Sequence, residues 1–411
     1  MRVVYTKQEF PESWSFAVFL AGPTPRDVEV PSWRPEAIAW FDRISTEMGI
    51  NEGLVLFIPE YPEGEEQWAE GEYTDQTEWE KAGLNFADVV MFWVPRDMTW
   101  MPAFTTNVEF GRWVGSGKAV LGHPEGAPKT RYLDWLAGEE NVPMLLTLDG
   151  TCRAVLDKHP GHEVLTLRKK GERHVPLLVW TTPMFQDWYA AQVAVGNRLD
   201  EAQVRWVFHM PKLGKVFSWV LWVKVWIKAE NRWKENEWVF ARSDISTVVL
   251  WGHGPRPDPT KTGPLNNLLD ASVVLIREFR SPVRNAAEFV YEVPGGSSAK
   301  DGEDPLQTAS DEVHEETGLI IDADRFRALG SRQVAATLSS HHAHLYVAQL
   351  SAAEMAQAKA LAAAGTSHGI EEDSEQTYVE VRSLREMLHT ELVDWSMLGM
   401  VFKGLADIAS R

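Results

Sequence analysis

Three glutamates in the last third of the chain have the residue type and spacing of a metal site. Glu312 precedes Glu315 and Glu316 by three and four residues, so the three share one side of a helix and repel one another. A hard divalent cation such as Mg²⁺ or Mn²⁺ turns this repulsion into binding, because it takes oxygen ligands and leaves room for water and phosphate. The alternative is an acidic, solvated helix face.

A short helix with clear ends is predicted to hold these glutamates. Asp304 is placed to cap its start, Pro305 takes the first helical position, and Gly318 is placed to end it. Its apolar face has spacings of three and four and consists of Leu306, Ala309 and Val313. A glycine-rich turn that includes Gly296 leads into this helix.

The stretch that begins at this turn resembles the Nudix box. The matching residues are Glu303, Glu312, Val313, Glu315, Glu316, Gly318 and Leu319. The resemblance implies that Gly296 and the three glutamates form a metal site for Mg²⁺.

Two features of the stretch depart from the family's pattern. Asp311 stands where the family has an arginine that orients a box carboxylate. Six residues, rather than five, separate Gly296 from Glu303. A nearby basic residue is expected to replace the arginine, and the candidates are Lys300, Arg325 and Arg327.

The residues before the box resemble those of one Nudix branch, the ADP-ribose and nucleotide-sugar pyrophosphatases. The matching residues are Arg277, Arg280, Pro282, Val283, Glu292, Pro294 and Gly296. The resemblance implies that Arg277, Arg280 and Glu292 bind substrate, since guanidinium groups grip pyrophosphate oxygens in pairs. The alternative is that both arginines are surface charges on a turn. The resemblance also implies a catalytic base on a later loop, where spacing does not choose among Glu371, Glu372 and Glu375.

A second pair of acidic residues lies in the first third of the chain. Asp88 begins a predicted buried strand, and Glu109 lies near the start of the helix that follows. A carboxylate can trap the oxocarbenium-like state of N-glycosidic bond cleavage, while a second acid protonates the departing base. Both residues also have a simpler explanation, as helix-end groups favoured by the helix dipole.

The first third resembles the nucleoside 2-deoxyribosyltransferase-like family. The resembling pieces are VFLAGP (18–23), the EWE…AD segment (78–88), TTNVEFGRW (105–113) and SGK (116–118). The resemblance implies that Glu109 is the nucleophile and that Asp88 is the acid near the base and sugar. Ala103 stands six residues before Glu109, where many of these transferases have a further aspartate.

A doubly wound parallel sheet is predicted to position these residues, because buried apolar runs alternate with helical segments. The predicted strands are 16–20, 54–58, 89–94, 119–121 and 142–148, and the predicted helices are 33–48, 79–86 and one that begins at 107. Ligands bind at the carboxyl ends of such strands. Gly22, Pro23 and Asn107 gather there and are the predicted substrate-binding residues.

Two α/β domains are predicted from the length of 411 residues. The predicted limits are 1–145 for the first domain, 146–200 for a connector and 201–411 for a Nudix α/β/α sandwich with a mixed sheet. The charged run 168–174 is expected to be solvated. Aromatic, alternating strands such as 216–227 are expected at the start of the second domain, and by resemblance to the pyrophosphatase branch they predict a homodimer.

Composition excludes several classes of partner. The formal charge of −19 argues against a general nucleic-acid-binding role, which needs a basic surface. The most apolar stretch, 216–227, contains Lys224 and is too short to cross a membrane. Cys152 is the single cysteine, which fits a reducing cytoplasm.

These observations predict a bifunctional enzyme of nucleotide metabolism that acts on nucleotides or nucleosides. One domain would hydrolyse a nucleoside diphosphate derivative with Mg²⁺, and the other would cleave an N-glycosidic bond or transfer a deoxyribosyl group. A nucleotide-sensing protein with one or both sites inactive is the alternative, which Asp311 and Ala103 favour. A third reading makes the first domain a dimerisation scaffold.

Overall fold

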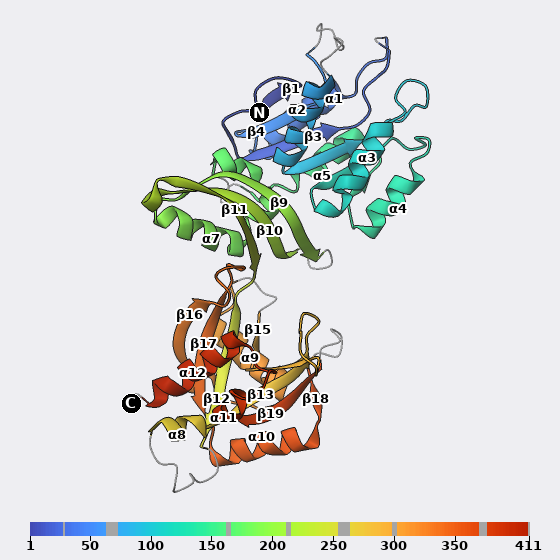
Figure 1. Ribbon diagram of the computed structural model, residues 1–411. Helices are drawn as coiled ribbons and strands as arrows, with labels where there is room; N and C mark the ends of the chain where they lie inside the picture. The colour runs from blue at the N-terminus through green and yellow to red at the C-terminus, as the bar shows by residue number, and fades with distance from the viewer. Residues whose placement is uncertain are drawn as a thin grey trace. The chain divides into compact units, whose positions relative to one another are not determined.

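The computed structural model describes residues 1–27, 29–62, 73–161, 166–210, 215–253, 264–297, 302–369 and 376–409. The chain divides into two compact units, Met1–Ala241 and Arg242–Arg411 (Figure 1). This division differs from the predicted limits at 145 and 200, since the strands expected at the start of a second domain lie in the first unit. Within the described residues, no helix has the length and apolar character needed to cross a membrane.

A six-stranded parallel sheet forms the centre of the first unit. Its strands are β1 (Arg2–Tyr5), β3 (Phe16–Ala21), β4 (Leu54–Ile58), β5 (Val89–Trp93), β6 (Ala119–Gly122) and β7 (Met144–Leu145). The order across the sheet is β1-β4-β3-β5-β6-β7. The direction of winding reverses between β3 and β5, so their carboxyl ends form the switch point where ligands bind in such sheets.

Helices cover both faces of this sheet, as predicted. Side chains of α1 (Arg34–Glu47) and α5 (Leu148–Leu156) pack on one face. Those of α2 (Tyr73–Phe86), α3 (Phe104–Trp113) and α4 (Arg131–Glu139) pack on the other. The central strands are apolar throughout because both of their faces are covered.

The predicted strand 142–148 is largely wrong. Only Met144–Leu145 pairs with β6, and α5 begins at Leu148. The Thr147 hydroxyl accepts a hydrogen bond from the Gly150 N–H and so caps this helix.

A three-stranded sheet completes the first unit. Its strands are β9 (Arg198–Met210), β10 (Lys215–Ile227) and β11 (Arg232–Arg242), and β9 pairs antiparallel with β10. Leu199, Trp219 and Leu221 pack with Phe185 of α7 (Pro183–Ala194) in the same core as α1 and α5. Residues that precede and follow position 200 therefore share one core, which places the expected connector inside this unit. Its smaller elements are β2 (Ser13–Trp14), β8 (Arg168–Lys169), α6 (Leu177–Trp180), η1 (Val114–Ser116), η2 (Lys170–His174) and η4 (Lys228–Glu230).

The second unit is a mixed sheet between two helical layers. Its strands are β12 (Ile245–Gly252), β13 (Ser272–Phe279), β14 (Phe289–Glu292), β15 (Gly295–Gly296), β16 (Arg327–Gln333), β17 (His342–Gln349), β18 (Ser367–His368) and β19 (Thr377–Ser383). β12 and β17 pair in parallel, whereas β13 pairs antiparallel with both β12 and β19. The predicted α/β/α layering and mixed sheet are confirmed.

Helices lie on both faces of this mixed sheet. α9 (Pro305–Thr317) and α10 (Ala352–Ala364) pack on one face of the sheet. α8 (Pro264–Leu269), α11 (Leu384–Met387) and α12 (Trp395–Ala409) lie on the other, and η5 (Ala323–Arg325) follows α9. The Asp304 side chain accepts from the Leu306 N–H, and Gly318 ends α9 with a φ of 68°. The helix ends predicted from the sequence are therefore confirmed.

Candidate active site

The loop after β3 brings the backbone of two strands into close contact at the switch point. Gly22 has a φ of 153°, and a Cβ added to it would lie 2.3 Å from the carbonyl oxygen of Trp93, the last residue of β5. Only glycine fits there, because any side chain would push β3 and β5 apart. The loop is thus fixed next to the carboxyl end of β5.

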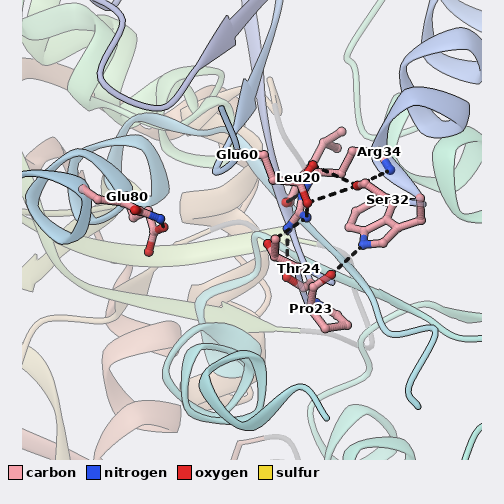
Figure 2. A network of polar contacts seen from close by, with 10 residues as sticks. Leu20, Pro23, Thr24, Ser32, Arg34, Glu60 and Glu80 are labelled. Carbon is pink, nitrogen blue, oxygen red and sulfur yellow. Dashed lines mark hydrogen bonds and ion pairs between the residues drawn. The ribbon is translucent and has the colours of Figure 1, made fainter. Parts of the chain in front are cut away.

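Arg34, at the start of α1, holds this loop in place (Figure 2). Its Nε donates to the Leu20 carbonyl at 3.2 Å, its Nη2 to the Gly22 carbonyl at 2.8 Å and its Nη1 to the Thr24 hydroxyl at 3.2 Å. Glu60, which follows β4, forms an ion pair with Arg34 and accepts from the Ser32 hydroxyl at 2.8 Å. The ends of two strands are therefore tied to one buried cation.

Two carboxylates, those of Glu80 and Glu109, interact electrostatically with Arg34 of this network. Glu80 comes from α2 and Glu109 from α3, which cover the same face of the sheet. Burial, together with the charge of Glu80, raises the pKa of Glu109 to about 7 against the opposing charge of Arg34. Burial also raises the pKa of Glu80, against the hydrogen bond from Gln76 and the charge of Arg34.

Two carboxylates in a poorly hydrated site do not both ionise readily, so burial and the charge of Glu80 favour the protonated form of Glu109. Glycosidic bond cleavage through a covalent intermediate needs an ionised carboxylate and a protonated one together.

The raised pKa of Glu109 should make the free energy of unfolding depend on pH. A raised carboxyl pKa adds stability below the unfolded value of 4.5, and this stability is lost as the pH rises through about 7. Glu109→Gln should therefore match the wild type at pH 4 and exceed its unfolding free energy by about 1–3 kcal/mol at pH 8. Thermal unfolding across this range measures the difference, with the exposed Glu78→Gln on α2 as control. Equal differences at both pH values would contradict the raised pKa of Glu109.

Asp88 lies away from Glu109, in contrast to the sequence-based expectation. It precedes β5, so it stands at the amino end of the strand, and its side chain is fully buried. Its Oδ2 accepts from the Ala17 N–H at 2.9 Å and pairs with Arg168 at 2.5 Å, and its Oδ1 accepts from the Leu177 N–H at 2.8 Å. These contacts fix β8 and α6 to the sheet at the amino ends of β3 and β5, which is a structural role.

The charged run 168–174 was expected to be solvated. This expectation is wrong for Arg168, which is 0% exposed. The carboxylate whose charge acts on Glu109 is Glu80, which was not among the residues predicted from the sequence. A signal was present: Glu80 belongs to the quoted EWE…AD segment and lies six residues before the end of α2. Since α2 runs back toward the amino edge of the sheet, that position is about 9 Å closer to the carboxyl edge.

The other predicted residues of this site gather at the carboxyl edge. The Pro23 carbonyl accepts from the Trp33 Nε1 at 3.1 Å, and Gly22 is held by Arg34. Asn107 is exposed on α3, and its Oδ1 accepts from Arg96, the third residue after β5. The structure thus brings Gly22, Pro23, Asn107 and Glu109 to one end of the sheet.

In the second unit, the glycine turn packs against two of the predicted metal ligands. A Cβ on Gly296 would lie 2.3 Å from Glu312 Oε1, and the Gly295 N–H donates to Glu316 Oε2 at 2.8 Å. Glu316 is buried, whereas the Glu315 side chain is exposed. No three acidic, histidine or cysteine side chains among the described residues are arranged to hold a metal. Ligation of Mg²⁺ by these glutamates stays a prediction, and Glu371, Glu372 and Glu375 lie outside the described residues.

Arg280, which follows β13, lies among several glutamates. It forms ion pairs with Glu278 at 2.8 Å and Glu292 at 3.1 Å. Burial lowers the pKa of Arg280, but Glu292, Glu278 and Glu316 together raise it above its ordinary value. A positive charge therefore stands next to Glu316 despite Asp311.

The described basic residues that were expected to replace the arginine missing at Asp311 form ion pairs with other residues. Arg325 pairs with Glu354 at 2.6 Å, and Arg327 pairs with Asp407 at 2.5 Å. Asp311 accepts from the Gln307 side chain at 2.8 Å, and Lys300 lies outside the described residues. The expectation for Arg325 and Arg327 is thus corrected, since both face other partners.

Arg277 lies between two aromatic rings. Its guanidinium is 4.7 Å from the centre of the Phe289 ring and 4.6 Å from that of Tyr378, and it pairs with Glu380 at 3.3 Å. Arg277 belongs to β13 and is partly exposed, so it is not a surface charge on a turn.

Comparison with known proteins supports the interpretation of the first unit. No curated protein matches the chain. Residues 15–127 match a protein-family model described as nucleoside 2-deoxyribosyltransferase like. The matched span begins just before β3, ends after β6 and includes Gly22, Glu80 and Glu109. This part of the first unit is therefore similar to nucleoside 2-deoxyribosyltransferase-like proteins.

Proposed function

We propose that the first unit cleaves the N-glycosidic bond of a nucleoside or nucleotide, or transfers its sugar to a second base. The observation that carries the proposal is the pair of carboxylates, Glu80 and Glu109, next to the loop that Arg34 fixes. The similarity of residues 15–127 to nucleoside 2-deoxyribosyltransferase-like proteins supports it.

The pKa of about 7 leaves part of Glu109 ionised at neutral pH, and this form attacks the anomeric carbon of the sugar while the bond to the base breaks. Glu80, whose pKa burial raises, acts in its protonated form and gives its proton to the departing base, which leaves as a neutral molecule. The glycosyl-enzyme that remains is attacked by water or by a second base, and Glu80, now ionised, takes the proton of the attacking group. The two displacements retain the configuration at the anomeric carbon. Arg34 keeps the loop at Gly22 in position throughout.

Release of free base from a panel of nucleosides and nucleotides, followed by chromatography, tests this proposal. We expect base to accumulate with wild-type enzyme, and a second base added to the mixture to appear as a new glycoside if transfer occurs. A wild-type protein that releases no base from any member of the panel would show that this unit binds its ligand without cleaving it.

We further propose that the second unit hydrolyses a nucleoside diphosphate derivative, such as ADP-ribose or a nucleotide sugar. The specific observation is the packing of the glycine turn against Glu312 and Glu316 beside Arg280. Mg²⁺, if held by Glu312, Glu315 and Glu316, would neutralise charge on the phosphates. Arg277 and Arg280 would grip the phosphate oxygens.

For the second unit, we expect Mg²⁺-dependent turnover of ADP-ribose that Glu316→Gln lowers by about 10²-fold or more. Mg²⁺ should also raise the melting temperature of the wild type more than that of this variant. The exposed Glu391→Gln is the control. If wild type and Glu316→Gln are equally silent toward a panel of nucleoside diphosphate derivatives, hydrolysis is wrong, and nucleotide binding without turnover becomes the better account. The predicted homodimer stays a prediction.

A further inference from the structure

Arg96 is a buried cation whose contacts are neutral. It is 7% exposed and follows β5 at the carboxyl edge of the sheet. Its Nη1 donates to the carbonyls of Lys129 at 2.5 Å and Pro128 at 3.5 Å, and its Nη2 donates to Asn107 Oδ1. Its buried Nε has no hydrogen-bond partner. In the described part of the chain no carboxylate forms an ion pair with it, and burial lowers the pKa of Arg96.

This arrangement is costly for the protein on its own. A buried cation without a counter-charge, and a buried N–H without an acceptor, each reduce stability. By contrast, the buried Arg34 and Arg168 of the same unit each form an ion pair, with Glu60 and Asp88 respectively. A missing counter-charge at the ligand-binding edge of the sheet indicates that a ligand supplies it.

The start of α3 offers a second, independent feature that favours an anion. α3 has ten residues, and its N-cap, Ala103, has a φ of 60° and provides no side-chain cap. The N–H groups of Phe104, Thr105 and Thr106 have no acceptor within the helix, and the helix dipole adds positive charge there. Arg96 reaches this turn through Asn107. The guanidinium of Arg96 therefore lies beside the first turn of α3.

The position fits one end of a nucleotide whose other end is at Glu109. Thr105 and Glu109 are four residues apart on α3, which is about 6 Å along the axis. A sugar ring and one methylene group span a comparable distance between the anomeric carbon and a 5′-phosphate. Ala103 brings no negative charge that would repel such a group.

We propose that Arg96 and the first turn of α3 bind the phosphate of a nucleoside 5′-monophosphate, so that the substrate of Glu109 is a nucleotide rather than a neutral nucleoside. This inference rests on the proposed function of the first unit for the role of Glu109. The phosphate site itself does not depend on catalysis, and it can be measured by binding.

The binding experiment uses the full chain with inorganic phosphate, a nucleoside 5′-monophosphate and the matching nucleoside as separate probes. We expect phosphate and the monophosphate to raise the melting temperature of the wild type by a few degrees at saturating concentration. Arg96→Gln should lose this shift and Arg96→Lys should keep part of it, because lysine retains the charge without the paired donors. Arg112→Gln, an exposed arginine on the same helix, is the control.

The kinetic experiment compares kcat/KM for the monophosphate and the nucleoside. In the wild type the monophosphate should be preferred by about 10-fold or more, and Arg96→Gln should reduce the preference mainly through KM. Cleavage of nucleosides without any response to phosphate would overturn the phosphate site and leave the proposed function standing. Phosphate binding that depends on Arg96, without cleavage of any substrate, would support the phosphate site and overturn the proposed function.

A second variant keeps the inference open to disproof if Arg96→Gln does not fold. Asn107→Asp places a carboxylate where the amide oxygen accepts from Arg96, which gives Arg96 a counter-charge from the protein itself. It should weaken the shift caused by phosphate. A shift of wild-type size in Asn107→Asp, or no shift in the wild type, would count against the site.

Discussion

Glu109→Gln should lower base release by about 10³-fold or more while the first unit stays folded. Glutamine has the shape of glutamate but cannot form the covalent bond to the sugar. The carboxylate is half-buried, and its pKa of about 7 leaves a large ionised fraction at neutral pH. Loss of the nucleophile therefore removes the first chemical step.

Glu78→Gln on α2 is the matched control, since this glutamate is exposed and lies two residues from Glu80. Circular dichroism and thermal unfolding establish that each variant is folded before rates are compared. Base release by Glu109→Gln at more than a tenth of the wild-type rate would rule out a covalent role for this residue.

Glu80→Gln separates the acid from the nucleophile. Its loss should matter most for substrates whose base is a poor leaving group, because these need a proton in the transition state. A base that departs readily as an anion should be released almost as fast as by the wild type. A loss of equal size for both kinds of substrate would show that Glu80 only tunes the charge of Glu109.

The elements of both units could be predicted where local pattern decides the structure. The run Leu54–Ile58 is a strand with the predicted bounds, and α1 (Arg34–Glu47) matches the predicted helix 33–48 to within one residue at each end. The ends of α9 follow from Asp304, Pro305 and Gly318, whose backbone preferences act within a few residues. These signals are local, so one sequence is enough to detect them.

Contacts between distant segments could not be predicted in this way. Arg168 is eighty residues from Asp88 in the sequence, and its neighbours are charged, so its own surroundings suggest a solvated loop. Its burial arises only because β8 passes beside Asp88. The role of Arg280 next to Glu316 has the same origin, since the sheet brings β13 and α9 together.

Asp88→Asn should be among the most damaging single changes in the first unit. It leaves Arg168 fully buried without its counter-charge, a change that costs about 3–5 kcal/mol in comparable buried pairs. Burial lowers the pKa of the nearby Lys118 to about 7, and Asp88 is the charge that opposes this shift. Without Asp88 the pKa of Lys118 should fall further, so Lys118 favours its neutral form and Arg168 remains a buried cation without a counter-charge.

The melting temperature of the first unit should fall by about 6–20 °C in Asp88→Asn, as expected for this loss in a unit of its size. Asp88→Asn combined with Arg168→Met should recover part of the loss, because the orphaned charge is removed and asparagine still accepts from the Leu177 N–H. Base release per folded molecule should change little, since Asp88 stands at the opposite edge of β5 from Glu109. A stable Asp88→Asn protein with abolished base release would restore Asp88 as the acid and make the burial of its ion pair incidental.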